Sequence, residues 1–170
     1  GSLKGYALLV WHGPTANQTV IQQINTHKTP VLYLMTTQNN GSDANALNIG
    51  MKLSSRNGVD EVQGEVNTQF QLFELSDELK SAIQQWPPLK VPFGKIEVIA
   101  GNALISQRIG NVKKSDPILY FGGDLNRKYG VIIGEGLWRW KLMEFAKTQK
   151  TTSFTELIQR TTQYLTVKNN

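Results

Sequence analysis

Short, nearly continuous hydrophobic runs alternate with polar segments in the first part of the chain. Residues 6–14 (YALLVWHGP) and 30–37 (PVLYLMTT) each predict a strand covered on both faces, as in a parallel sheet. Between them, residues 19–28 (TVIQQINTHK) place apolar side chains at helical spacing, after a candidate N-cap at Thr15 or Asn17. This order of strand, helix and strand predicts a right-handed βαβ unit.

The middle of the chain follows a different pattern. Residues 38–48 (QNNGSDANALN) are rich in turn-forming residues and predict a loop. Residues 95–110 (KIEVIAGNALISQRIG) predict a hairpin that turns at Gly101 and Asn102. We therefore expect a mainly β, antiparallel insertion at about residues 58–112.

Two segments inside this insertion have their own signals. Residues 77–86 (DELKSAIQQW) predict a short helix with Ser76 as its N-cap. Residues 87–94 (PPLKVPFG) do not fit a central strand, because proline has no N–H group to donate to a neighbouring strand.

The α/β pattern returns in the last third of the chain. Residues 116–123 and 130–134 predict strands, and residues 137–148 and 152–166 predict helices. Ser153 or Thr152 is the predicted N-cap of the last helix, and Glu156 completes an S-x-x-E capping box with Ser153. Residues 1–170 are therefore interpreted as one α/β domain, with a mostly parallel sheet flanked by helices.

Composition narrows the classes of function. The chain has 170 residues, 39% of them hydrophobic and 18% charged, and no apolar run approaches the roughly 18 residues that cross a bilayer. We expect no direct membrane insertion by this segment. The net charge of +5 comes from scattered basic residues rather than a stripe, so we expect no nucleic-acid partner.

The chain also lacks several kinds of chemistry. Without cysteine it has no thiolate nucleophile and no disulfide, and two histidines make a histidine-rich zinc site improbable. We predict no metal site and no cofactor. A phosphate-binding loop is absent too, because the G-E-G stretch does not have the form G-x-x-x-x-G-K-[ST].

The stretch GVIIGEGLWRW, residues 130–140, holds most of the candidate ligand or interaction residues. Glu135 lies between two glycines where a strand gives way to a helix, and α/β proteins bind ligands at such places. Alternatively, Glu135 stabilises the helix through its dipole. Trp138, Arg139 and Trp140 belong either to core packing or to a partner or ligand surface. Adjacent helical residues point about 100° apart, so the two indoles cannot share one face, and we expect at least one of them to be largely buried.

A further candidate is His12, which ends the first predicted strand. It is either a general base or a structural histidine bonded at the strand end.

Two of these segments resemble class I glutamine amidotransferase-like domains, which are flavodoxin-like α/β sandwiches. LLVWHGPTAN, with His12 at its turn, resembles the early strand that helps to form the oxyanion hole in that family. TPVLYLMTTQ resembles the strand that leads to the catalytic cysteine on a strained elbow, and Met35 occupies the cysteine position.

The segment GVIIGEG resembles the family stretch that supplies the catalytic His and Glu. Gly134 stands in the His position and Gly136 in the Glu position. Together with Met35, these two glycines make a degenerate triad, since a thioether has no proton to lose and glycine offers no base. The resemblance therefore implies a pseudoenzyme, a non-catalytic relative of the family.

A second resemblance spans nearly the whole chain. PPLKVPFG, DPILYF and GEGLWRWKL are similar to segments of the C-terminal domain of large Bacteroidetes membrane proteins that carry a von Willebrand factor A domain. The resemblance implies a soluble domain of a membrane-anchored bacterial protein, on the periplasmic side. We expect an interaction or structural role there, with a protein partner or with other domains of the parent chain. The alternative is a divergent enzyme or small-ligand-binding domain that uses the carboxyl ends of the strands.

Overall fold

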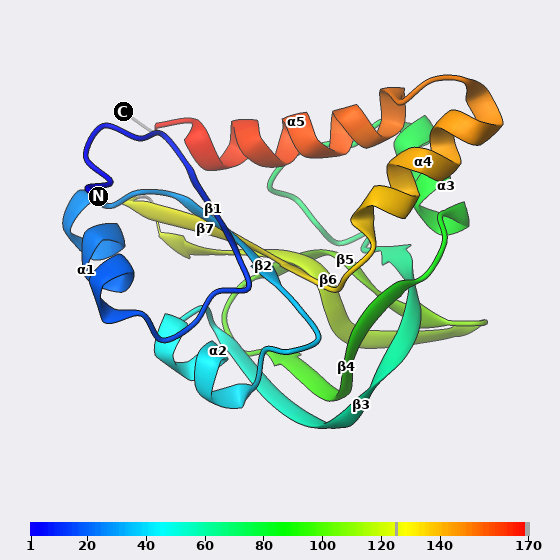
Figure 1. The fold of residues 1–170 in the computed structure, drawn as a ribbon. Coiled ribbons are helices and arrows are strands. Elements are labelled where there is room, and N and C mark those ends of the chain that lie inside the picture. Colours follow the sequence, from blue (N-terminus) through cyan, green and yellow to red (C-terminus); the bar gives the residue numbers. More distant parts are fainter. Residues whose placement is uncertain (125, 169–170) are drawn as a thin grey trace.

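A seven-stranded mixed sheet with helices on both of its sides makes up this α/β fold (Figure 1). The computed structural model describes residues 1–124 and 126–168. In chain order the elements are β1 (Leu9–His12), α1 (Gln18–His27), β2 (Val31–Met35), α2 (Gly41–Leu47), β3 (Met51–Val66), α3 (Asp77–Gln85), β4 (Leu89–Val98), β5 (Asn102–Ile109), β6 (Val112–Asp124), β7 (Arg127–Ile133), α4 (Leu137–Thr148) and α5 (Thr152–Thr166).

The strands are ordered β1-β2-β7-β6-β5-β3-β4. Only the pairs β1–β2 and β2–β7 are parallel among these described strands, and the other four neighbouring pairs are antiparallel. The prediction of a mostly parallel sheet was therefore wrong. A continuous apolar run such as Ile118–Phe121 in β6 shows that both faces of a strand are covered, but it does not fix the direction of the neighbouring strand.

The long strand β3 bends the sheet so that β4 approaches the end of β7. Residues 51–62 of β3 pair with β4, with an irregularity in register between Ser55 and Val59, and the last four residues of β3 pair with β5. The predicted hairpin at Gly101 is therefore wrong, because β4 and β5 both pair with β3 and not with each other. The proline-containing β4 lies at the end of the strand order, as expected for a strand that lacks donors.

The N-caps of two helices agree with the sequence analysis, and one helix was not predicted. The side chain of Asn17, one of the two predicted candidates, caps α1, and that of Ser76 caps α3, as predicted. The segment 38–48, predicted as a loop, contains α2. A capping box between Asn40 and Asp43 starts this helix, which is too short for its apolar periodicity to stand out.

The predicted capping box of α5 is wrong, because a neighbouring helix supplies the cap. The carboxylate of Glu144 in α4 accepts hydrogen bonds from the backbone N–H groups of Ser153 and Phe154, both at 2.9 Å. Glu156 instead accepts hydrogen bonds from the backbone N–H and the hydroxyl of Ser76. The two glutamates thus connect α4 to α5 and α5 to the start of α3.

The helices cover the sheet unequally. In Figure 1, α5 and α4 lie above the sheet, and α2 lies below it. Val131, Ile132 and Ile133 of β7 are buried beside β6, and the strand predicted over residues 130–134 is confirmed. No helix in residues 1–124 and 126–168 combines the length and the apolar character needed to cross a membrane.

Candidate functional site

The three parallel strands end at the same border of the sheet, and most of the predicted site residues lie there. Strand β1 ends at His12 and β2 ends at Met35, while Gly134 follows β7. The Gly13 N–H donates to the Leu34 carbonyl at 2.9 Å, and the Gly134 N–H donates to the Met35 carbonyl at 3.1 Å. We call this region, residues 12–14, 35–39 and 133–136, the carboxyl edge.

Met35 is an ordinary buried strand residue. Its side chain is 1% exposed, and its backbone pairs with Ile133 of β7. Among the described residues, non-glycine backbone with positive φ occurs at Lys28, Asn48 and Gln149, so Met35 does not form a strained elbow. A nucleophile at this position would point into the core rather than toward a substrate.

The two glycines that the resemblance assigns to a degenerate triad have backbone conformations that favour glycine. Gly134 has φ 130° and Gly136 has φ 106°. A Cβ atom at Gly134 would lie 3.3 Å from Leu89 Cβ, from the Lys90 carbonyl oxygen and from Val91 Cγ1. Close approach of β4 thus leaves little room for a side chain at the position where the resemblance would place a histidine.

Glu135 fixes the position of two other segments. Its backbone exchanges hydrogen bonds with that of Lys90 in β4, at 2.8 and 3.0 Å. Its half-buried carboxylate accepts a hydrogen bond from the Thr37 hydroxyl at 3.0 Å. Gly136, not Glu135, is the N-cap of α4, and among the described residues no side chain caps this helix. Glu135 therefore joins β2, β4 and β7 instead of capping α4.

Asn39 is a structural residue of the carboxyl edge that the sequence reasoning missed. Its buried side chain accepts a hydrogen bond from the Thr36 N–H at 2.9 Å. Its amide donates to the Pro14 carbonyl at 2.7 Å and to the Asp43 carboxylate at 3.1 Å. The turn after β1 is thus tied to the start of α2. A strand followed within a few residues by asparagine is the signal that could have indicated this turn.

The remaining candidates do not converge with Glu135. In the described residues no hydrogen bond or ion pair links His12, Glu135 and Arg139. His12 is exposed at the end of β1, and the guanidinium of Arg139 lies 5.4 Å from the ring centre of Trp138. In residues 1–124 and 126–168, no group of three or more acidic or histidine side chains is placed to hold a metal ion.

The two tryptophans of GLWRW have opposite environments. Trp140 is 1% exposed, and its indole N–H donates to the Pro87 carbonyl at 2.7 Å. Its ring centre lies 5.0 Å from that of Trp86. Trp138 is 63% exposed on the outer side of α4. The structure therefore confirms that one tryptophan of the pair packs in the core.

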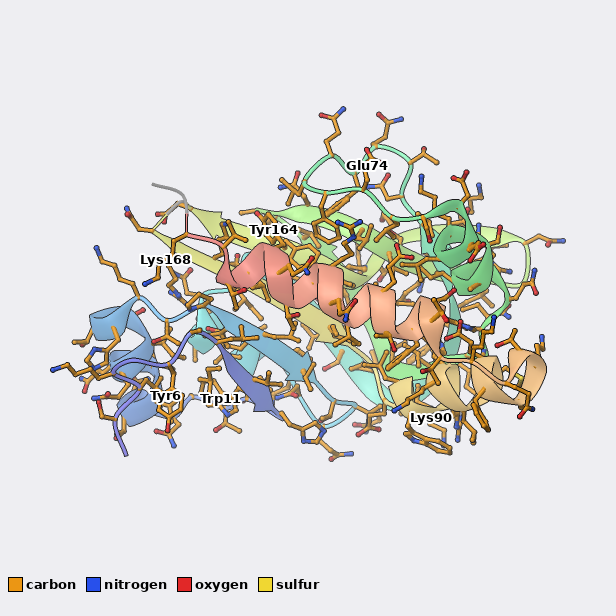
Figure 2. All side chains as sticks on the ribbon, turned by 90° about the horizontal axis from the view of Figure 1, so that it is seen from above. Tyr6, Trp11, Glu74, Lys90, Tyr164 and Lys168 are labelled. Carbon is orange, nitrogen blue, oxygen red and sulfur yellow. The ribbon has the colours of Figure 1, made fainter. Side chains whose placement is uncertain are left out.

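A polar hollow of about 400 Å³ borders the carboxyl edge. Thr37, Asn39 and Asn40 line it on one side, and residues of the β3 irregularity, including Arg56, line it on the other. Lys90, whose backbone pairs with that of Glu135 at the carboxyl edge, lies on the side of the molecule where α4 lies (Figure 2). Arg56 gives the hollow a cationic group, so a small anionic ligand is the chemistry that it suits.

Comparisons with known proteins bear on the fold of the chain and not on its chemistry. No protein-family model matches the chain, and no curated protein is significantly similar in sequence. Among solved structures, the cytoplasmic protein STM3548 from Salmonella typhimurium has a TM-score of 0.57 at 11% identity, over 94% of this chain and 73% of that one. The cytoplasmic protein STM1381 from Salmonella typhimurium LT2 has a TM-score of 0.56 at 12% identity, over 92% and 72%.

A third structure carries the same fold inside a much longer chain. The β-galactosidase from Rahnella sp. R3 has a TM-score of 0.57 at 11% identity, over 94% of this chain but only 23% of the enzyme. At such low identities these likenesses show the fold alone. They support an α/β architecture that also occurs as one part of a larger protein.

Proposed function

We propose that the chain is a non-catalytic, amidotransferase-like domain with an interaction or structural role. The observation that carries this proposal is the use of the polar groups at the carboxyl edge. The Glu135 carboxylate is bonded to Thr37, and the Asn39 amide is bonded to Pro14 and Asp43. Side chains that hold loops together in this way are the framework of a fold, whereas catalytic groups converge on a substrate.

The parent protein is part of the same proposal. The resemblance of PPLKVPFG and GEGLWRWKL supports a membrane-anchored bacterial protein with a von Willebrand factor A domain, in which this domain lies on the periplasmic side. Its partners are then a protein or other domains of the parent chain. A flavodoxin-like, amidotransferase-type ancestry is also proposed on the resemblance, since the likeness to solved structures supports the α/β class only.

Glutamine turnover tests the non-catalytic role. The purified domain is incubated with glutamine, released ammonia is measured, and hydroxylamine is added to trap a glutamyl thioester. We expect no protein-dependent ammonia from the wild-type chain, and none from Met35→Cys, because Gly134 supplies no base. Ammonia release by the wild-type chain that disappears in His12→Ala would contradict the proposal.

A small-ligand site is the second candidate, favoured by the hollow beside Arg56. Its test is the thermal unfolding temperature with added acetate or glutamate. A ligand that binds the folded state raises this temperature by mass action. An increase that Arg56→Ala abolishes would favour the second candidate, and an unchanged unfolding temperature would count against it.

A further inference from the structure

Helix α4 presents an apolar stripe that the fold leaves uncovered. Trp138, Leu142 and Phe145 are 63%, 57% and 48% exposed. Their spacing of four and then three residues places them on one side of a helix. The opposite side holds Trp140 and Glu144, which are buried. We call Trp138, Leu142 and Phe145 the α4 seam. Figure 1 shows α4 at a corner of the molecule, where one side of the helix is free of other elements.

The charges beside the α4 seam have one sign. Arg139 and Lys141 lie on its two flanks, since successive residues are about 100° apart around a helix. The only acidic residue of α4 is Glu144. It points toward α5, where its carboxylate is bonded to the N–H groups of Ser153 and Phe154. A partner on the α4 seam therefore meets apolar side chains bordered by cations.

We propose that the α4 seam binds an amphipathic helix of a partner protein, one with an apolar stripe and acidic flanks. The inference rests on the proposed interaction role and names the class of partner. A four-three spacing of apolar residues is the pattern by which two helices pack along a common seam, and the flanking charges select the partner. Tryptophan and arginine, which are adjacent here, are also the residues that most often dominate binding energy at interfaces.

Charge argues against a second copy of the chain as the occupant. Two α4 seams packed together would bring Arg139 and Lys141 of one copy close to the same cations of the other. Like charges on the flanks of a helix pair destabilise it, whereas glutamate or aspartate on the partner would form ion pairs with both cations.

The probe is a synthetic helical peptide of about three heptads with Leu at positions a and d and Glu at positions e and g. A matched peptide carries Lys in place of every Glu. Both are labelled with fluorescein and titrated with the wild-type domain while fluorescence anisotropy is followed. We expect saturable binding of the Glu peptide and binding at least roughly tenfold weaker for the Lys peptide, because charge decides between them.

Three variants locate the binding surface. Leu142→Glu should weaken binding of the Glu peptide at least about tenfold, and Arg139→Glu combined with Lys141→Glu should reverse the preference toward the Lys peptide. Val112→Glu is the matched control, since Val112 is an exposed apolar residue at the start of β6. It should bind as the wild type does. Circular dichroism melts establish that each variant is folded.

Several results would overturn the inference. They are no saturable binding, equal binding of the two peptides, and an affinity that Leu142→Glu leaves unchanged. Binding to phosphatidylcholine–phosphatidylserine vesicles in place of the peptide would identify a membrane surface instead. Self-association in sedimentation velocity that Leu142→Glu abolishes would identify a second copy. Glutamine turnover in the same samples tests the proposed function separately, so a domain with neither turnover nor peptide binding refutes only the helix partner.

Discussion

The indole N–H of Trp140 donates a hydrogen bond of 2.7 Å to the backbone carbonyl of Pro87. This bond joins α4 to the segment that leads from α3 into β4, and it satisfies the one polar atom of a fully buried side chain. Pro87 and Trp140, which belong to two segments that stand out separately in the sequence, are thus parts of one junction.

Truncation of the two neighbouring tryptophans should have very different effects on stability. Trp140→Ala should lower the free energy of unfolding by about 3 to 5 kcal/mol, because it opens a cavity beside Trp86 and leaves the Pro87 carbonyl without its donor. Trp138→Ala, on the exposed side of α4, should cost less than about 1 kcal/mol. Urea unfolding of both variants measures the difference. Similar losses for the two would refute the assignment of Trp140 to the core and Trp138 to the surface.

Glu144 should matter more to the start of α5 than the residues of the predicted capping box. Glu144→Ala removes the acceptor of two backbone N–H groups and should cost roughly 2 kcal/mol. Ser153→Ala should cost much less, because no side chain caps α5 from within its own segment. Urea unfolding compares the two. A larger loss of stability for Ser153→Ala would instead support the cap at Ser153 that the sequence predicts.

The sequence predicts local features of this fold better than its long-range pairing. Asn17, Ser76 and the buried run 131–133 are correctly assigned, because a cap or a buried strand depends on a few neighbouring residues. The cap supplied by Glu144 and the pairing of β3 with both β4 and β5 join residues that are not adjacent in the chain. No local pattern distinguishes them from the alternatives.

The candidate site, too, combines local features that the sequence predicts with long-range contacts that it does not. The order of strands in a βαβ unit places His12 and Met35 at one border of the sheet, and the GVIIG strand brings Gly134 beside them. The partner of Glu135 could not be predicted, because Thr37 is 98 residues distant in sequence and its hydroxyl approaches only once β2 and β7 are paired. The approach of β4 to Gly134 likewise joins distant segments, since Lys90 and Glu135 exchange backbone hydrogen bonds.

The free energy of unfolding should fall at alkaline pH because of Tyr120. Burial raises the pKa of Tyr120 far above its ordinary value of 10.0, and its hydroxyl donates to the Ile49 carbonyl at 2.7 Å. The folded chain keeps this proton where the unfolded chain loses it, so the contribution is complete below about pH 10 and is lost as the pH rises above it.

The variant Tyr120→Phe should reduce this alkaline loss, at a cost of about 1 kcal/mol near neutral pH from the missing hydrogen bond. Urea unfolding between about pH 8 and pH 11 measures the slope. Tyr6→Phe, a change at an exposed tyrosine, is the control and should leave the slope unchanged. An alkaline slope that Tyr120→Phe does not alter would assign the effect to other groups.

The strength of the hydrogen bond between Thr37 and Glu135 tests most directly whether the carboxyl edge is structural or catalytic. Its measurement is a double-mutant cycle of urea unfolding with Thr37→Val, Glu135→Gln and the double variant, with Glu61→Gln at an exposed position as the control for loss of a charge. If the edge is structural, each single variant is destabilised and the coupling free energy is about 1 kcal/mol, while Glu61→Gln stays within about 0.5 kcal/mol of the wild type. If Glu135→Gln instead raises the free energy of unfolding and the coupling is zero, the carboxylate is held there at a cost to stability, as functional groups often are, and the non-catalytic account is contradicted.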